Sequence, residues 1–555
     1  MKEPAEGPGR AGLVGAVVAA LVTLPGLGVG TLWDNSETAY GEVAREILLT
    51  HDWVTMHLNS VPYFVQPPLY FWLGAVFSLL MHGATPLALR LPAALSTIAL
   101  ASFTGYAVAR QAGTRVGIYA AVILSTSLMP AVIGRLAIMD ALLDLAVAMT
   151  IFWWFRGLET GRDRYIIFGW VAAGGGFLAK GLVAPVVALL VIVPFYFWNR
   201  RSEPTRAPSP RAWTVGGLAF LAIVAPWPAA LVSHYHLFPL EKLIGEYTVG
   251  RYTGIVENQS GPIWYYLPVI ILGFFPWIAF LPMAIVYGAR QLRDGVLPGP
   301  SFSRLVRLGF TWMVVPLLFF SFARTKLPNY VALEFPALAL ITALYFETVA
   351  RKGGSRSAVI SAATVPVTIG ALAFAIWLFT RNNRLTAEIA IAVPPLLGMA
   401  AAIFGGSLLT ALLVAGAKNV RAAPFPLAIA AMIAVDVLAV TVLPHAEAFK
   451  PVPRLAALIE HERQPGDVVA IQGVSGGNAL LFYTHPVVRV LAPPADGDPQ
   501  SDGVDPRTVI CGASRAWVIA PVVRPAYDPT YGRIRHTVAV DRKAELLLYN
   551  GPRCR

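Results

Sequence analysis

The sequence predicts a mainly α-helical protein that crosses a membrane many times and ends in a small α/β domain. Hydrophobic residues fill 56% of the 555 positions and charged residues only 13%, whereas soluble domains carry about 25% charged residues. Apolar runs of about 20 residues, the length that a transmembrane helix needs, recur as far as residue 443. From residue 444 the pattern changes to short β-rich runs between Pro, Gly and Asp turns.

The apolar runs divide the first part of the chain into about thirteen spans. We predict them at 11–31, 88–109, 115–133, 138–155, 165–180, 182–198, 212–232, 263–288, 308–323, 329–350, 358–380, 389–415 and 422–443. The Gly-rich segment 172–182 is expected to form the turn between two adjoining spans. The first run is long and lacks an obvious cleavage site with small residues, so we interpret it as a retained span and not as a signal peptide.

Lys and Arg residues set the predicted orientation. They gather in alternate short loops, which the positive-inside bias places in the cytoplasm: Arg110 and Arg115; Arg156, Arg162 and Arg164; Arg200, Arg201, Arg206 and Arg211; Arg290, Arg293, Arg304 and Arg307; Arg351, Lys352 and Arg356; Lys418 and Arg421. The same bias accounts for the net charge of +12, so no nucleic-acid partner is expected. An odd number of spans places the N-terminus in the cytoplasm and the C-terminal domain outside it.

Two further features complete the predicted architecture. The long outer loop 32–87 contains the segments 37–49 and 68–81, which we expect to form interfacial helices on the outer leaflet. The chain is thus divided into a transmembrane domain, 1–443, and an extracytoplasmic α/β domain, 444–555, of a usual domain size.

The two cysteines, Cys511 and Cys554, both lie in this last domain. Two thiols this far apart cannot hold a metal without other ligands. An extracytoplasmic location would permit a disulfide between them. A disulfide and two free thiols both remain open from the sequence.

Ionisable residues within the membrane region gather at one predicted face. Glu37, Asp140, Lys180, Arg324 and Lys326 all fall at the outer ends of spans or in outer loops. Placing an ionisable side chain within the membrane costs free energy, so such residues usually mark a functional site or a substrate pathway. Each one also has a structural interpretation, because acids cap helix N-termini and cations at helix ends extend toward the interface.

Asp140 is the strongest candidate of this set. Asp144 follows it at i+4, so the two carboxylates share one helix face. Arg135, one turn away, is expected to pair with Asp140. Cations near such an acid suit a phosphate group, and the acid suits proton abstraction from a hydroxyl or amine acceptor. A structural ion pair is the alternative.

Six segments resemble a known family. The segment "SETAYGEVAREILLTHDWVTMHLNSVPYFVQPPLYFWL" is similar to the first outer loop of the bacterial GT-C glycosyltransferases, a group that includes the aminoarabinose (lipid A) transferase and proteins like dolichyl-phosphate-mannose-protein mannosyltransferase. Similar segments follow in the family's order: "RLPAALS" at 90–96, "RLAIMDALL" at 135–143, "FLAKGL" at 177–182, "GPIWYYLPVIILGFFPW" at 261–277 and "FFSFARTKLPNYVALEFPALAL" at 319–340.

The resemblance implies a GT-C fold in a bacterial inner membrane. It also implies a polyprenyl-phosphate sugar donor, inversion at the anomeric carbon, and an outer-face acceptor that is lipid A, another envelope glycolipid or a protein. It assigns catalytic roles to Glu37 and Asp140. It assigns donor-phosphate binding to Lys180, Arg251, Arg324 and Lys326, and substrate binding to Tyr63, Gln66, Arg135 and Tyr330.

The chain departs from the family pattern at several positions. Gln66 replaces a lysine, Val65 replaces an acid and Gln259 replaces a histidine. Some relatives are thought to bind a metal near these places. Because Val65 and Gln259 are poor ligands, we assign no metal site. The loss of the lysine at Gln66 puts a lipid A acceptor in question.

Two other classes of function fit part of the pattern. A lipid or sugar transporter would also have many spans and buried charges. Transporters, however, often show internal repeats and midplane sites, and no clear repeat is found here; Asp436, in the last span, is the main charge away from the outer face. A non-enzymatic scaffold would need no convergent acids and cations.

Overall fold

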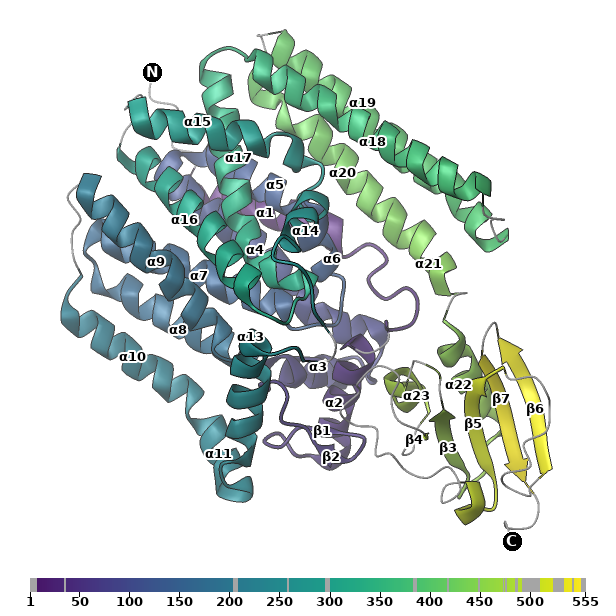
Figure 1. The fold of residues 1–555 in the computed structure, drawn as a ribbon. Helices are drawn as coiled ribbons and strands as arrows, with labels where there is room; N and C mark the ends of the chain where they lie inside the picture. The colour runs from purple at the N-terminus through teal and green to yellow at the C-terminus, as the bar shows by residue number, and fades with distance from the viewer. Residues whose placement is uncertain are drawn as a thin grey trace.

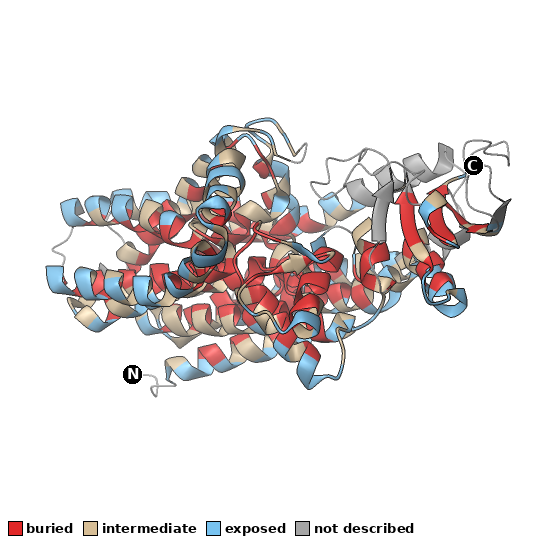
Figure 2. Cartoon of the chain, turned by 90° about the horizontal axis from the view of Figure 1, so that it is seen from below, coloured by how far each residue is buried: buried red, intermediate tan, exposed pale blue. Residues whose placement is uncertain are grey.

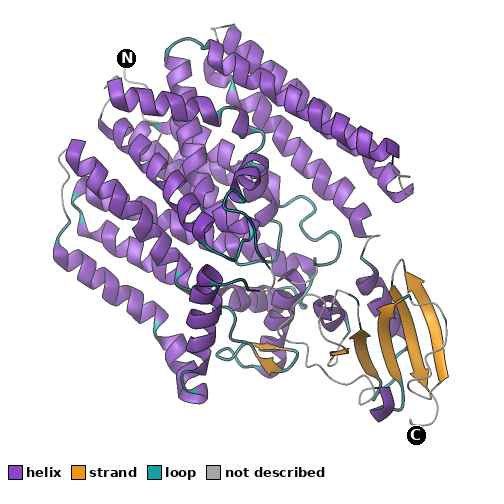
Figure 3. Cartoon of the chain, in the orientation of Figure 1, coloured by secondary structure: helices purple, strands orange, loops and turns teal. Residues whose placement is uncertain are grey.

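The computed structural model describes residues 7–33, 36–202, 208–256, 259–294, 300–382, 387–416, 419–447, 450–472, 474, 477–484, 488–491, 510–522, 534–541 and 544–550. Helices dominate, and a sheet lies at the C-terminal end (Figures 1 and 3). The predicted class, a mainly α polytopic membrane protein with a small α/β unit, is confirmed. The division at residue 443 stays a prediction.

The helices of the first two thirds of the chain form one bundle (Figure 1). They are α1 (Pro8–Thr23), α4 (Pro86–Ala112), α5 (Thr114–Ser125), α6 (Leu128–Ile133), α7 (Asp140–Thr160), α8 (Asp163–Lys180), α9 (Val183–Ser202), α10 (Pro210–Val224), α11 (Pro226–Tyr235), α12 (Phe238–Leu240), the π-helix η1 (Glu241–Gly250), α13 (Arg251–Thr253), α14 (Tyr266–Gly273), α15 (Leu281–Asp294), α16 (Pro300–Phe322), the 3-10 helix η3 (Pro328–Glu334) and α17 (Phe335–Arg351). A second layer contains α18 (Arg356–Asn382), α19 (Ala387–Ala415), α20 (Pro424–Val437) and α21 (Leu443–Ala446).

Within the described residues, seven helices are long and apolar enough to cross a membrane, or eight if the bent pair α10–α11 is one span. The count of about thirteen therefore stays a prediction. α7 and the η3–α17 segment are the most enclosed of the seven. Figure 2 shows buried residues along the centre of the bundle and exposed ones around it. The two central helices carry the candidate site described below.

Several predicted spans differ in detail from the observed helices, and the one predicted at 115–133 is divided into α5 and α6. The first helix ends at Thr23, before Pro25 and Gly26, because Gly26 has a φ of +69° that a helix cannot contain. The span predicted at 263–288 is interrupted between α14 and α15 around Pro276, which has no N–H to donate. The span predicted at 212–232 bends by 45° between α10 and α11.

The predicted turn between the two adjoining spans is present, but it occupies only the end of the Gly-rich segment. α8 runs through these glycines to Lys180, and the chain turns at Gly181, where φ is +68°. A Cβ atom at Gly176 would lie 2.4 Å from the Cβ of Ala184 on α9, far inside contact distance. This glycine therefore permits the close approach of α8 to α9.

The first outer loop contains α2 (Ser36–Thr50), the hairpin strands β1 (His57–Leu58) and β2 (Val61–Pro62), and α3 (Leu69–Leu80). The two helices predicted in this loop are thus present.

The C-terminal unit is a five-stranded mixed sheet with two helices, α22 (Pro451–Glu462) and α23 (Gly477–Tyr483). Its strands are β3 (Val468–Gln472), β4 (Val488–Leu491), β5 (Ala516–Pro521), β6 (Ile534–Asp541) and β7 (Ala544–Asn550), in the order β4-β3-β5-β7-β6. β3 is parallel to β4 and β5, and β7 is antiparallel to β5 and β6.

This unit packs against the first outer loop (Figure 1). Leu480 and Phe482 of α23 belong to the same apolar cluster as Val43 and Ile47 of α2. Cys511 is disulfide-bonded, and Cys554 lies outside the described residues.

Candidate functional site

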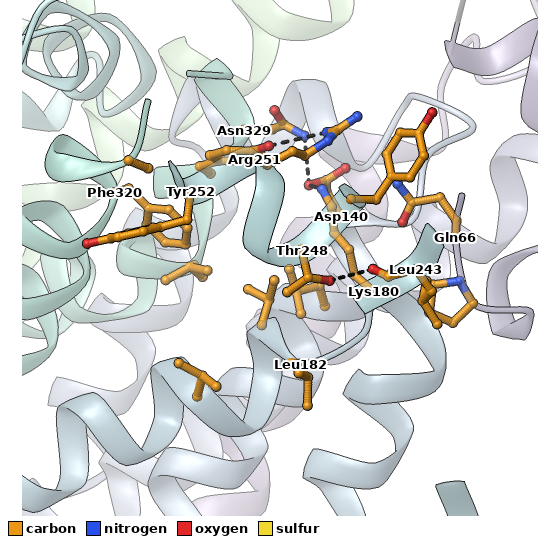
Figure 4. Close-up of a pocket in the computed structure, with 18 of the residues that line it drawn as sticks. Gln66, Asp140, Lys180, Leu182, Leu243, Thr248, Arg251, Tyr252, Phe320 and Asn329 are labelled. Carbon is orange, nitrogen blue, oxygen red and sulfur yellow. Dashed lines mark hydrogen bonds and ion pairs between the residues drawn. The ribbon is translucent and has the colours of Figure 1, made fainter. Parts of the chain in front are cut away.

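A cavity of about 120 Å³ lies where the ends of several bundle helices meet (Figure 4). Its wall is formed by the loop before α3 and by residues of α7, α8, α9, η1, α13, α16 and η3.

The polar centre of the cavity is Asp140, the first residue of α7. Its Oδ1 atom accepts hydrogen bonds from Lys180 Nζ at 2.6 Å and from Asn329 Nδ2 at 2.8 Å. α7 and α8 are antiparallel neighbours, so the start of one meets the end of the other, where Lys180 lies. None of the other described residues donates to Oδ2 of Asp140, which leaves this atom available to a bound molecule.

A second cation lines the cavity beside an aromatic ring. Arg251 Nη1 donates to Tyr330 Oη at 3.3 Å, and the guanidinium lies 5.4 Å from the centre of the Tyr247 ring. Lys180 Nζ lies 5.6 Å from the centre of the Tyr330 ring. Tyr330 thus lies between the two cations, at a place where a phosphate could contact both.

Main-chain hydrogen bonds hold Arg251 in position. The amides of Arg324 and Thr325 donate to the carbonyls of Tyr252 and Arg251, each at 3.0 Å, and Lys326 N donates to Gln259 O at 2.9 Å. These contacts fasten α13 and the loop that follows it to the segment after α16.

The rest of the wall is largely apolar. It includes Leu143, Leu182, Val183, Val186, Leu243, Phe319, Phe320 and Leu333. Tyr252 stacks on Phe319 with ring centres 4.9 Å apart. A polar end with two cations and a long apolar wall suits an amphiphile with an anionic head group.

The structure brings half of the ten predicted site residues to this cavity: Gln66, Asp140, Lys180, Arg251 and Tyr330. The other five, Glu37, Tyr63, Arg135, Arg324 and Lys326, do not line it.

Glu37 is 1% exposed and its carboxylate is fully engaged in the fold. Arg90 Nε and Nη2 donate to its two oxygens, each at 2.9 Å, and the amides of Trp33 and Ala137 also donate to them. These contacts join α2, α4 and the segment before α7. The geometry is that of a structural ion pair.

Arg135 does not pair with Asp140, and that prediction is wrong. Arg135 Nη2 donates to Asp436 Oδ1 of α20 at 3.1 Å, and its other contacts are the carbonyls of Val22 and Pro25. The side chain points to α1 and α20, while Asp140 pairs with Lys180.

Three other predicted residues lie apart from the cavity. Lys326 is 4% exposed, and its Nζ donates to the carbonyls of Phe320, Ser321 and Ala323 at the end of α16. The Arg324 side chain is exposed, and Tyr63 packs edge-on against Phe71. The donor-phosphate role of the two cations and the substrate role of Tyr63 stay predictions.

Asn329 is not among the residues predicted from the sequence, although it lies between two of them, Lys326 and Tyr330. A search for charged residues overlooks a neutral amide. The signal was available in the segment "KLPNY", whose polar side chains follow the end of a span. Tyr247 and Thr248 of η1, which also line the cavity, had no such signal.

Within the described part of the chain, no group of three or more His, Cys, Asp or Glu side chains is arranged to hold a metal ion. That the protein has no metal site therefore stays a prediction from the sequence.

Sequence comparisons find one family and several relatives. Residues 65–229 match the family described as dolichyl-phosphate-mannose-protein mannosyltransferase. The undecaprenyl phosphate-alpha-4-amino-4-deoxy-L-arabinose arabinosyl transferase of Erwinia tasmaniensis is 30% identical over 444 residues, which cover 76% of this chain and 75% of that protein. The enzyme of the same name from Edwardsiella ictaluri is 30% identical over 60% of this chain and 58% of its own length. The chain thus matches less than two thirds of this second relative.

Solved structures show the same fold. ArnT from Cupriavidus metallidurans, bound to undecaprenyl phosphate, has a TM-score of 0.77 at 20% identity, with 97% of each chain covered. The oligosaccharyltransferase of Archaeoglobus fulgidus in its apo form has a TM-score of 0.51 at 11% identity, covering 92% of this chain and 69% of that one.

Proposed function

Because the chain belongs to the undecaprenyl phosphate-alpha-4-amino-4-deoxy-L-arabinose arabinosyl transferase family, we propose that it is a GT-C glycosyltransferase of a bacterial inner membrane. It moves a sugar from a polyprenyl-phosphate carrier to an acceptor on the outer face of the membrane. Relatives that carry this name, and the undecaprenyl phosphate bound to ArnT, support the donor class.

The observation that carries this proposal is the placement of Asp140, Lys180 and Arg251 around one cavity with an apolar wall. In this proposal the cations bind the donor phosphate, and the apolar wall holds the first part of the polyprenyl chain. Charge-assisted hydrogen bonds to phosphate are about twice as strong as neutral ones. They also stabilise the negative charge that grows on the leaving phosphate as the bond to the sugar breaks.

Asp140 is the proposed contact for the acceptor. The acceptor oxygen forms a bond to the anomeric carbon while the bond from that carbon to the phosphate oxygen breaks, and polyprenyl phosphate leaves. If the acceptor is a hydroxyl, its proton passes to Oδ2 of Asp140. If the acceptor is a lipid phosphate, it is already anionic, and Asp140 then orients Lys180 and Asn329.

The transporter alternative uses the same cavity but breaks no bond. The comparisons offer it no support, because the relatives are named as transferases. The proposed acceptors remain lipid A, another envelope glycolipid or a protein.

The test is transfer of radiolabelled sugar from polyprenyl-phosphate-sugar extracts by the purified chain. Asp140→Asn should lower the rate at least about 100-fold, the lower end of the usual contribution of a general base. Asp436→Asn is the matched control, because this carboxylate also pairs with a cation, Arg135, but lies away from the cavity. Equal rates for wild type and Asp140→Asn, with both proteins folded, would contradict the proposed role.

A further inference from the structure

A second cavity, of about 210 Å³, lies near the other end of the bundle. It is formed by the C-terminal ends of α4 and α7 and the start of α8. Asp140 and Arg156 are 16 residues apart on α7, which corresponds to about 24 Å along the helix. The second cavity is therefore separate from the candidate active site and lies at the end that the basic loops predict to be cytoplasmic.

Three arginines from three helices line this cavity: Arg110 of α4, Arg156 of α7 and Arg164 of α8. Arg156 Nη1 donates to Glu159 at 2.7 Å, but its Nε is buried and donates no hydrogen bond in the described part of the chain. Glu159 also lies 3.7 Å from Arg304, so its charge is shared between two guanidinium groups. The cavity thus carries an excess of positive charge.

The two outer arginines rest on tyrosines that line the same cavity. Arg110 Nη1 donates to Tyr106 Oη at 3.3 Å, and Arg164 Nη2 donates to Tyr165 Oη at 3.2 Å. Both arginines are exposed. Such long, exposed contacts are readily replaced by a charged acceptor, and an arginine fork matches the oxygens of a phosphate.

The inner wall of the cavity is aromatic and continues to the outside of the bundle. Trp153 stacks on Tyr165 with ring centres 5.5 Å apart and packs edge-on against Phe168. Phe168, on the next turn of α8, is 48% exposed. Apolar chains attached to a bound head group would therefore find a continuous apolar path along α8.

From this combination we infer that the second cavity binds the head group of an anionic phospholipid in the leaflet at this end of the bundle. The phosphate contacts Arg110 and Arg164, and Arg156 adds a third positive charge to the lining of the same cavity. The glycerol and the first acyl carbons lie along Trp153 and Phe168. A soluble phosphate would use the arginines but would gain nothing from the exposed aromatic path. Basic pockets between transmembrane helices are a known type of lipid head-group site.

The experiment compares lipid binding by two double variants of the full chain in detergent, by native mass spectrometry. Arg110→Gln/Arg164→Gln removes two cavity arginines. Arg162→Gln/Arg290→Gln removes the same charge from exposed arginines that do not line the cavity. Each protein is titrated with phosphatidylglycerol and, separately, with phosphatidylethanolamine.

We expect the cavity variant to bind phosphatidylglycerol at least about tenfold more weakly than wild type and the control variant. Phosphatidylethanolamine binding should be the same for all three proteins. Equal loss in both variants, or no loss in either, would overturn the proposal. Displacement of phosphatidylglycerol by an equimolar amount of soluble glycerol phosphate would overturn it as well, in favour of a soluble ligand. Should the double variant fail to fold, Arg164→Gln alone is used against Arg162→Gln.

Discussion

At the scale of single residues, the decisive finding is which carboxylate meets which cation. Asp140 pairs with Lys180 over 40 residues of sequence, and Arg135 pairs with Asp436 over 301. The first pair follows from two antiparallel neighbouring helices. The second depends on how α1, α6 and α20 pack together, and no local pattern in the sequence encodes this. The wrong prediction for Arg135 came from choosing its partner by proximity in sequence.

Glu37 gives a prediction that separates a structural from a catalytic role. Glu37→Gln leaves the buried Arg90 without a countercharge, and breaking a buried pair costs about 3 kcal/mol or more of unfolding free energy. We expect a clearly lower melting temperature in detergent. Glu246→Gln is the control, because its pair with Lys242 is exposed and contributes at most about 1 kcal/mol. A variant with wild-type stability but at least about 100-fold slower transfer would instead make Glu37 catalytic.

Glu42 of α2 gives a prediction for pH. Burial raises the pKa of this carboxyl group from 4.5 to about 7, against the lowering effect of Arg45. A raised pKa means that the folded state favours the protonated form. Stability should therefore fall as pH rises from about 4.5 to about 7, by up to about 3 kcal/mol.

The measurement is the melting temperature at pH 5 and pH 8. Glu42→Gln should remove most of the difference between the two values. Glu241→Gln, at an exposed carboxylate, should leave it unchanged. A wild-type protein that is more stable at pH 8 than at pH 5 would show that this carboxyl group does not dominate the response.

At the scale of elements, the positions of the long helices were easier to predict than the residues at which helices end or break. Apolar runs predicted the positions of α4, α7, α8 and α9 within a few residues, because a helix that crosses a membrane must be apolar along the length that lies in the hydrocarbon core. Ends and breaks depend on single glycines and prolines whose effect is local. The Gly-rich segment was expected to form a turn, yet only Gly181 at its end does so. Gly176 lies inside α8, because a helix tolerates glycine where a neighbouring helix comes close.

Gly176 and its neighbour Gly175 test this explanation. A Cβ at Gly176 would meet Ala184, while a Cβ at Gly175 would meet nothing within 4 Å. Gly176→Ala should therefore destabilise the protein by about 1–3 kcal/mol through overpacking. Gly175→Ala should be neutral or stabilising by up to about 1 kcal/mol, because alanine favours the helix. The melting temperatures of the two variants test whether Gly176 permits the close packing of α8 on α9. Equal values would contradict this role.

At the scale of the whole molecule, the C-terminal sheet and the first outer loop form one structural region. α23 shares an apolar cluster with α2, and Leu32 N donates to Tyr483 Oη at 2.7 Å. The sequence predicted both parts but could not show that they touch, since more than 400 residues separate them. It likewise predicted the cluster of charges at one face, but not which five of the ten selected residues would line the cavity.

The central claim is that the cavity around Asp140 is a place where a sugar leaves a lipid phosphate. The most direct measurement uses a donor labelled twice, with tritium in the sugar and phosphorus-32 in the polyprenyl phosphate, and purified protein in vesicles. We expect tritium to appear in the acceptor while phosphorus-32 stays with the polyprenyl lipid, and Asp140→Asn to suppress this separation. Movement of both labels together across the membrane, without their separation, would contradict the account and indicate a transporter.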